Sequence, residues 1–421
     1  MIAGIRERAL LALVVGVFAL APRPSRAFSV LAHQGVVDSS WERVLVPALR
    51  RRFPDAEAED LIRARAFAYG GSHIADLGYF PLGNLEFTDL LHYVRSGDFV
   101  AALVESATSL DKYAFALGAL AHYVTDNIGH PEATNRAVAE IYPKLRKKYG
   151  DRVTYADSHS AHLATEFRFD VLQLSRSEQS PDLFHHAIAF EVSKPALERA
   201  FQATYGLRLD DLFTSTDTAI ATYRWGFRGL VHEATGIAWR LYRSDIQRLA
   251  PKATKAEFVY ELPRTDFEKE FGKTFREPGY FTRFIAFFVK LVPNVGPFKR
   301  LPYKPLPAHV RELFITALDH AADRYRSALP RGHQRHLELE NTNLDTGRPT
   351  RVGDYEPADH AYATLLAKLD ARDFTGVPSA LRADVLRFYR DRDAFLAAQD
   401  DNTEWRKVQR ALARLARLDP R

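Results

Sequence analysis

The stretch DKYAFALGALAHYVTDNIGHP, residues 111–131, decides the fold of this chain. Its apolar residues recur every three or four positions, which predicts an α-helix over 111–127 with one buried face. His122 and Asp126 are four residues apart, so on that helix they project from the same face, one turn apart. His130 follows after four more residues, near the expected end of the helix. Three side chains that can bind a metal therefore stand along one line of a largely apolar helix.

A second pair repeats this spacing farther along the chain. His162 and Glu166 in HLATE are again four residues apart, on a segment whose apolar period predicts a helix over 158–174. For a single pair, the simpler interpretation is a buried helix face with hydrogen-bonded histidines. Two pairs with the same spacing favour metal binding, and imidazole and carboxylate ligands together suit zinc.

Three further donors precede these pairs. His33 lies near the start of the chain, Asp76 lies in the glycine-flanked segment GGSHIADLGYF, and His92 lies in DLLHYV. We expect a loop around Asp76 and a short amphipathic helix around His92. Each alone has a simpler explanation, since Asp76 could cap a turn and His92 could be a hydrogen-bonded core residue. His73 and His159 are neighbours that could replace one of these donors, but a surface role is favoured for both.

Residues 1–27 have the pattern of a secretory signal peptide. Arg6 and Arg8 give a positive start, an apolar run covers 9–21, and small residues precede a cleavage point after Ala27. An uncleaved membrane anchor is the alternative, but the apolar run is short for a bilayer span. We therefore expect a secreted or periplasmic protein after signal-peptide cleavage near Ala27.

Cleavage at that point would make Phe28 the amino terminus. A free α-amine, with a pKa of about 8, can lose its proton to a metal, and the adjacent carbonyl can complete a chelate. Phe28 precedes His33 by five residues, which is close enough to reach the same ion. The alternative is that Phe28 only begins an ordered leading segment.

The composition indicates a globular chain that is stable without disulfides. Of its 421 residues, 46% are hydrophobic and 12% aromatic, which excludes global disorder. There is no cysteine, so export is not accompanied by disulfide formation. Removal of residues 1–27 takes away four arginines and one glutamate and lowers the formal net charge from +5 to +2. That small charge does not call for a polyanionic partner.

Most of the chain has the helical period, and strand signals are sparse. The predicted fold class is all-α, a multi-helix bundle with additional C-terminal helices. Helices are expected over 36–51, 56–69, 85–95, 99–106, 111–127, 133–148, 158–174, 182–203, 216–248, 308–328, 357–370, 377–398 and 402–418. Loops are expected at 293–307 and 330–356. A boundary near residue 250 would separate a donor-bearing domain, 28–250, from a helical C-terminal region, 251–421, in which no site residue is predicted.

At the donor positions the chain resembles the zinc-dependent phospholipase C family, within the superfamily that also holds the fungal single-strand nucleases. The resemblance implies an all-helical fold with up to three zinc ions, bound by the mature amino terminus and by a set of histidines and carboxylates. The implied metal ligands are Phe28, His33, Asp76, His92, His122, Asp126, His130, His162 and Glu166.

The resemblance also implies how these ligands are shared. The first ion would be held by His122, Asp126, Asp76 and His92. Asp126 would bridge to a second ion, held also by His33 and the Phe28 terminus. The third ion would be held by His130, His162 and Glu166.

The resemblance covers about residues 28–170, and the chain departs from the family in two places. The family usually begins with Trp and this chain has Phe28, but the backbone makes the bonds to the metal. Secreted phospholipases C and the nucleases typically have a longer interval between the positions of Asp126 and His130. The four-residue interval found here is more similar to that of the catalytic part of glycosylphosphatidylinositol-specific phospholipase D.

The implied activity is hydrolysis of a phosphodiester by metal-activated water, with Asp76 as the catalytic residue that orients or deprotonates the water. The implied substrate is a phospholipid, with transient contact to a membrane surface. The aromatic segment 280–292 could be an interfacial helix, although an ordinary buried helix is favoured. The amphipathic end of the chain, 405–417, is explained by a docked helix. No feature predicts a protein partner.

Two other functions stay open at the sequence level. The first is a secreted zinc nuclease for single-stranded nucleic acid, in which Tyr79, Phe80 or Tyr93 could stack on a base; these rings could equally surround a choline-like head group. Nucleic acid is the less favoured substrate. The second is a non-catalytic, helical binding protein stabilised by metal. Nine donors shared over three ions leave positions open to water, which favours catalysis.

Overall fold

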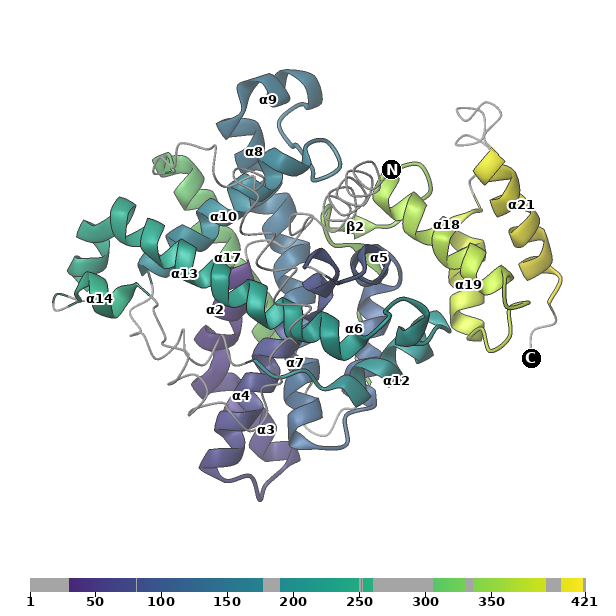
Figure 1. The fold of residues 1–421 in the computed structure, drawn as a ribbon, viewed down its shortest axis with the longest axis horizontal. Helices are drawn as coiled ribbons and strands as arrows, with labels where there is room; N and C mark the ends of the chain where they lie inside the picture. The colour runs from purple at the N-terminus through teal and green to yellow at the C-terminus, as the bar shows by residue number, and fades with distance from the viewer. Residues whose placement is uncertain are drawn as a thin grey trace, which may run out of the picture.

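A computed structural model of the chain describes residues 30–80, 82–176, 190–249, 251, 253–259, 306–330, 336–390 and 403–418. Helices form almost all of the secondary structure in these residues, and the sheet consists of two short strands (Figure 1). The all-α prediction is confirmed. The predicted signal peptide 1–27, the predicted terminal ligand Phe28 and the aromatic segment 280–292 lie outside the described residues.

Two helices in close contact form the centre of the fold. They are α4 (Ala58–His73) and α7 (Leu110–Gly129), which pack more extensively than any other pair of described elements. A Cβ atom placed on Gly71 or Gly118 would lie 1.9 Å from a backbone carbonyl oxygen of the other helix. Only glycine therefore permits this crossing, which brings the backbone of α4 against the helix that carries the first donors.

In Figure 1, α7 runs through the middle of the molecule, α4 lies at its lower edge, and the remaining elements are arranged around α7. Before α10 they are α2 (Val30–Ser40), the π-helical turn η1 (Trp41–Leu45), α3 (Val46–Arg52), the 3₁₀ helix η2 (Ile74–Tyr79), α5 (Leu85–Tyr93), α6 (Ser96–Glu105), the π-helical turn η3 (His130–Thr134), α8 (Asn135–Ile141) and α9 (Pro143–Tyr149). From α10 onward they are α10 (His159–Arg176), α12 (Lys194–Tyr205), η4 (Leu209–Asp211), α13 (Thr216–Leu249), α14 (Lys255–Phe258), α17 (Ala308–Ala328), α18 (Glu356–Asp370), α19 (Ser379–Phe388) and α21 (Thr403–Ala416). Side-chain N-caps fix where α7 and α5 begin. Ser109 Oγ accepts a hydrogen bond from the Lys112 amide at 3.4 Å, and Asn84 Oδ1 accepts one from the Phe87 amide at 3.3 Å.

Several predicted segments differ from the structure. In the helix expected over 182–203, the described residues 190–193 are not helical, and α12 begins at Lys194. The helix expected over 133–148 is interrupted, because Pro143 begins a new helix, α9, where its missing amide hydrogen costs nothing. The loop expected around Asp76 is instead the buried 3₁₀ helix η2. Of the glycines that suggested a turn there, Gly71 serves the close contact between α4 and α7, whereas Gly70 lies against the backbone of Glu191 and Gly78 against that of Asn84.

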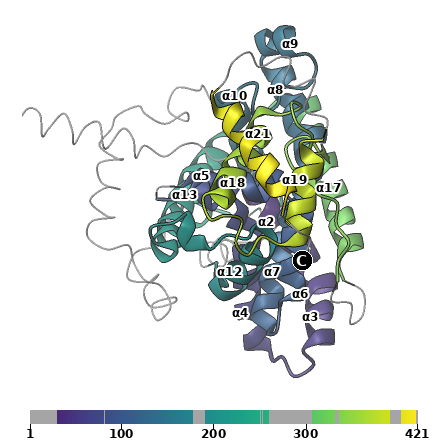
Figure 2. The ribbon, with the colours of Figure 1, turned by 90° about the vertical axis from the view of Figure 1, so that its right-hand side faces the viewer.

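The C-terminal helices α18, α19 and α21 lie together at one side of the molecule (Figure 2). Val408, Leu412 and Leu415 of α21 are buried, so the predicted docking of this helix is confirmed. The predicted boundary near residue 250 coincides with the end of α13, and α17, which follows it in the chain, packs against α7.

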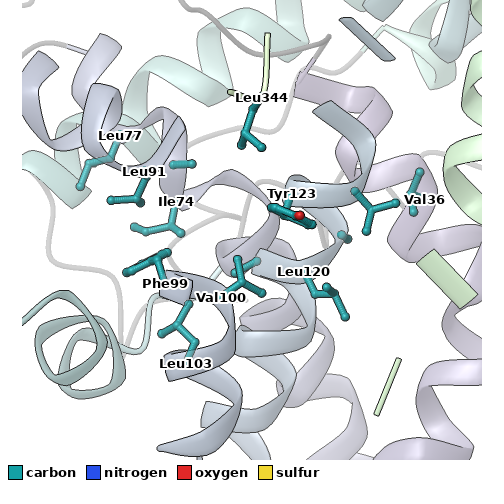
Figure 3. Packing of buried hydrophobic residues seen from close by; sticks show 14 of the residues in the cluster. Val36, Ile74, Leu77, Leu91, Phe99, Val100, Leu103, Leu120, Tyr123 and Leu344 are labelled. Carbon is teal, nitrogen blue, oxygen red and sulfur yellow. The ribbon is translucent and has the colours of Figure 1, made fainter. Parts of the chain in front are cut away.

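The predicted loop 330–356 contains the hairpin of β1 (Thr342–Asn343) and β2 (Arg348–Pro349). Leu344, between the strands, is 1% exposed and packs among core residues that include Leu91 and Tyr123 (Figure 3). Its amide donates to the backbone carbonyl of His92 at 3.0 Å. Burying such a leucine side chain contributes about 1.5–3 kcal/mol, so the hairpin is an integral part of the core.

No helix among the described residues is both long enough and apolar enough to cross a membrane.

Candidate metal centre

Eight of the nine predicted donors lie in the described part of the chain, and the structure brings all eight into one cluster. None is more than 3% exposed. They come from six elements: His33 from α2, Asp76 from η2, His92 from α5, His122 and Asp126 from α7, His130 from η3, and His162 and Glu166 from α10. The ninth, Phe28, lies outside the described residues.

The carboxylate of Asp126 stands at the centre of the cluster, between four imidazoles. Its Oδ1 lies 3.3 Å from Nε2 of His33 and 3.5 Å from Nε2 of His130. Its Oδ2 lies 3.1 Å from Nε2 of His122 and 3.4 Å from Nε2 of His92. The four-residue spacing along α7 thus places His122, Asp126 and His130 together as predicted, and π-helical turns such as η3 often occur at functional sites.

Backbone carbonyls fix the orientation of two of these rings. Nδ1 of His122 lies 3.0 Å from the Ser72 carbonyl oxygen, and Nδ1 of His92 lies 2.8 Å from the Thr88 carbonyl oxygen. A carbonyl oxygen only accepts, so each Nδ1 carries a hydrogen and donates it. In the neutral ring the lone pair is then on Nε2, which faces Asp126. Metal-binding histidines usually have this arrangement, in which one ring nitrogen donates to a carbonyl oxygen and the other faces the metal.

The donor atoms fall into three groups, in each of which all atoms lie within 4.8 Å of one another. They are His33, His122 and Asp126; Asp76, His92 and His122; and His130, His162 and Glu166. Zinc binds nitrogen and oxygen at about 2.0–2.2 Å, so two ligands of one tetrahedral ion lie roughly 3.3–3.5 Å apart. The distances from the Asp126 oxygens to the four imidazole nitrogens, 3.1–3.5 Å, are therefore close to the spacing of ligands that share a zinc ion.

Several buried donor atoms have no hydrogen-bond partner among the described residues. They are both ring nitrogens of His33, both carboxylate oxygens of Asp76, both of Glu166, and Nδ1 of His162. Leaving a buried polar atom unsatisfied costs about 1–3 kcal/mol. Metal ions bound in the three groups would satisfy one ring nitrogen of His33, Nδ1 of His162 and carboxylate oxygens of Asp76 and Glu166, which is the main structural indication that the cluster binds metal.

The pKa shifts of the clustered side chains also indicate a cation-binding site. Burial raises the pKa of Asp76 well above its ordinary value. Burial would also raise the pKa of Asp126, but attraction to His122, His33 and His130 holds it well below that value. Burial lowers the pKa of His33 well below 6.5. Without a cation, the ionised Asp126 therefore lies beside Asp76 and His33, which resist ionisation. It also lies beside His122, whose pKa burial alone would lower but attraction to Asp126 and Asp76 raises to about 9. A bound cation would favour the ionised carboxylates and neutral imidazoles.

In the group of His130, His162 and Glu166, the hydrogen bonds of Asn135 determine which ring nitrogen of His162 carries a hydrogen. Asn135 Nδ2 donates to the Asp345 carbonyl at 2.8 Å, which leaves Asn135 Oδ1 to accept from Nε2 of His162 at 2.9 Å. In the neutral ring the lone pair of His162 is then on Nδ1, which lies 3.0 Å from Glu166 Oε1. Nδ1 of His130 lies 3.7 Å from the same oxygen. Without a cation, burial alone would lower the pKa of His162, but attraction to Glu166 and Asp345 raises it to about 10, so a metal at Nδ1 would replace a proton.

Asp345 is a functional candidate that sequence reasoning missed. It is 4% exposed, and its Oδ1 lies 3.3 Å from Nδ1 of His130 and 3.4 Å from Nε2 of His162. It follows β1, in a stretch whose Asn, Asp and Gly residues predict a turn but give no helical or strand period. The sequence predicts a loop here, but it does not predict that this loop packs against α10 and η3.

His73 and His159 remain outside the three groups. The surface role expected for His73 is wrong: its ring is buried, 4.8 Å from that of Phe227, and burial lowers its pKa to about 3. His159 is exposed, as expected, with its ring 4.1 Å from that of Tyr155.

In the part of the chain that the structure describes, the three aromatic residues proposed to stack on a base present no fully exposed ring. Tyr79 and Tyr93 are each 2% exposed, and their rings lie 6.3 Å and 6.0 Å from that of His92. Phe80 is half-buried, with its ring 4.3 Å from that of Tyr223.

Comparison with known proteins gives a family match. Residues 38–214 match the model of a family described as zinc dependent phospholipase C. The matched range contains seven of the eight clustered donors and ends before Asp345. No curated protein and no solved structure matches the chain.

Proposed function

We propose that this chain, which over residues 38–214 belongs to the zinc dependent phospholipase C family, is a secreted enzyme that hydrolyses phospholipid phosphodiester bonds. The observation that carries the proposal is the buried carboxylate of Asp126 between four imidazole nitrogens at 3.1–3.5 Å. A structural zinc needs only one closed set of four ligands, whereas this cluster offers three groups, two of which share His122. Asp126 Oδ1 also faces both His33 and His130, so it lies between the first group and the third, and neighbouring groups of this kind suit a multinuclear hydrolytic site.

The proposed ligand sets cover up to three zinc ions. His122, Asp126, Asp76 and His92 would hold the first, Asp126, His33 and the Phe28 terminus the second, and His130, His162 and Glu166 the third. When bound, zinc supplies Lewis acidity, which makes a water acidic and stabilises negative charge on phosphate oxygens.

Within this site we assign the proton-accepting role to Asp76. Both of its carboxylate oxygens are buried and accept no hydrogen bond from the described residues, and Oδ1 lies 3.7 Å from Nε2 of His92. An oxygen without a donor can orient a water and accept its proton. The carbonyl-bound rings of His92 and His122 keep their positions while this happens.

A phospholipid is favoured over nucleic acid as the substrate. Binding of single-stranded nucleic acid usually depends on exposed aromatic faces, and Tyr79 and Tyr93 beside the donors are buried. The family match supports a lipid ester, and contact with the membrane surface would be transient. The proposed export depends on the signal peptide predicted at residues 1–27, whose pattern supports a secreted or periplasmic location.

A hydrolysis panel tests this function. The mature chain from Phe28, loaded with zinc, is assayed on phosphatidylcholine and phosphatidylinositol vesicles and on single-stranded DNA. We expect release of a phosphorylated head group, and its loss in Asp76→Asn. Asp384→Asn is the matched control, because Asp384 is also a buried aspartate but bonds to Tyr362, at 2.8 Å, outside the cluster.

Two outcomes would contradict the proposal. Cleavage of DNA alone would support the nuclease. A protein that holds zinc and leaves every ester intact would support the non-catalytic binding protein.

A further inference from the structure

The carboxylate of Asp345 is anchored through one oxygen only. Its Oδ2 accepts from the Tyr355 hydroxyl at 2.5 Å and from the Tyr155 amide at 3.2 Å. These two bonds set the direction of the carboxylate, and they leave Oδ1 on the side of the donor cluster.

Oδ1 is buried and accepts no hydrogen bond from the described residues, although it lies 3.3 Å from Nδ1 of His130 and 3.4 Å from Nε2 of His162. Both oxygens of Glu166 and Nδ1 of His162 are likewise buried and have no hydrogen-bond partner among the described residues. A buried carboxylate oxygen without a donor is costly, and a cation is the group that commonly satisfies it. Asp345 thus has in common with His162 and Glu166 a buried donor atom without a partner among the described residues, and it lies beside the group that His130, His162 and Glu166 form.

The hairpin that carries Asp345 is fitted closely to the helices around the site. The Asp345 carbonyl accepts from Asn135 at 2.8 Å, and Ser96 Oγ donates to the Thr342 carbonyl at 2.7 Å. Gly347 has φ +66°, and a Cβ atom there would lie 2.8 Å from the Asn127 carbonyl oxygen. The chain therefore holds the Asp345 side chain in place with backbone contacts on both sides of it.

From these contacts we infer that Asp345 supplies a fourth protein donor to the ion at His130, His162 and Glu166. The inference rests on the proposed metal site but adds a ligand from outside the part of the chain that matches the family. Zinc usually takes four ligands, so a fourth donor would fill its shell. The ion would then fasten the hairpin of the C-terminal region to α10 and η3, and metal binding would stabilise the contact between the two halves of the chain.

Substitution by cysteine gives a direct test, because the chain has no cysteine of its own. In Asp345→Cys loaded with cobalt(II), we expect a thiolate-to-cobalt charge-transfer absorption in the near ultraviolet. The wild-type protein cannot give this band. The matched control is Asp384→Cys, in which the new thiol lies away from the cluster and should give none. An absent band in a folded, cobalt-loaded Asp345→Cys would overturn the inference.

A second variant covers the case in which the cysteine protein does not fold. In Asp345→Asn, one of the zinc ions should bind at least about a hundredfold more weakly, since loss even of an outer-shell partner costs about 10–100-fold. Zinc affinity and content are measured by chelator competition and elemental analysis, with Asp384→Asn as the control. Unchanged affinity in Asp345→Asn would contradict a ligand role. A wild-type protein without zinc would overturn the proposed function as well, whereas zinc-loaded, active Asp345→Asn of normal affinity would overturn this inference alone.

Discussion

Nε2 of His122 and Nε2 of His92 face each other at 3.3 Å, while Nδ1 of each ring faces a backbone carbonyl oxygen. Both Nδ1 atoms donate, so in neutral rings both Nε2 atoms carry lone pairs, and two lone pairs repel at this distance. Either an extra proton or a metal ion must lie at this end of the rings. The carboxylates of Asp76 and Asp126 also face these Nε2 atoms, so this site favours a positive charge.

Asp126→Asn should remove zinc and activity together. The carboxylate faces four imidazoles, and an amide cannot serve as an anionic bridge between two ions. We expect zinc content to fall by at least one ion per chain and hydrolysis to fall by about a hundredfold or more, as when a main stabilising group is removed. Elemental analysis and the vesicle assay measure the two quantities. Full activity in the variant would exclude a bridging role, and Asp384→Asn should leave both values unchanged.

The metal-free protein should lose stability as the pH rises above neutrality. Burial alone would lower the pKa of His122, but attraction to Asp126 and Asp76 raises it from 6.5 to about 9. A histidine whose pKa is raised by folding contributes stability that is fully present below the unfolded value, 6.5, and is lost as the pH rises through about 9. We expect the melting temperature of zinc-free protein to fall over this interval.

The zinc-loaded protein provides the comparison. Zinc must displace the proton from His122, so its affinity should increase over the same pH interval and its binding should release protons. Thermal unfolding of both forms between pH 6.5 and 9 checks the prediction. A melting temperature of the zinc-free form that rises with pH would be inconsistent with a protonated His122.

The helical donors could be predicted because their spacing is local. His122 and Asp126, like His162 and Glu166, lie one helical turn apart, so the sequence alone fixes their common face once the helix is recognised. The sequence gives no comparable rule for Asp345. Its position depends on a hairpin that packs against α5 and α6, and such long-range contacts leave no periodic signal.

The structure around Asp76 was mispredicted because glycine has two different structural uses. In GGSHIADLGYF the glycines suggested a turn, with His73 at the surface and Asp76 in a loop. In the structure Gly71 lies at a helix crossing, His73 is buried, and Asp76 is in a 3₁₀ helix. A glycine that permits φ > 0 and a glycine that permits close backbone contact look the same in one sequence.

The amino terminus should contribute to the ion beside His33. A chain that keeps an extra residue before Phe28 has no free amine at that position, so we expect weaker binding of one zinc ion and unchanged binding of the others. Elemental analysis after dialysis against a weak chelator compares the extended and mature forms. His33→Asn in the mature chain serves as a positive control for loss of the same ion. Equal zinc content in the two forms would exclude ligation by the terminus.

The crossing of α4 and α7 should be intolerant of a single added methyl group. Gly118→Ala would place Cβ 1.9 Å from the Ala68 carbonyl oxygen, so the helices must separate, and we expect a loss of about 1–3 kcal/mol in the free energy of unfolding. Zinc affinity should fall too, because His122 lies one turn farther along α7. Gly236→Ala in α13 is the matched control: a Cβ there meets nothing within 4 Å, so alanine should stabilise the helix by about 0.5–1 kcal/mol. Denaturant titration, with zinc binding measured on the same samples, compares the two. Equal stability changes in both variants would mean that the crossing does not position the donors on α7.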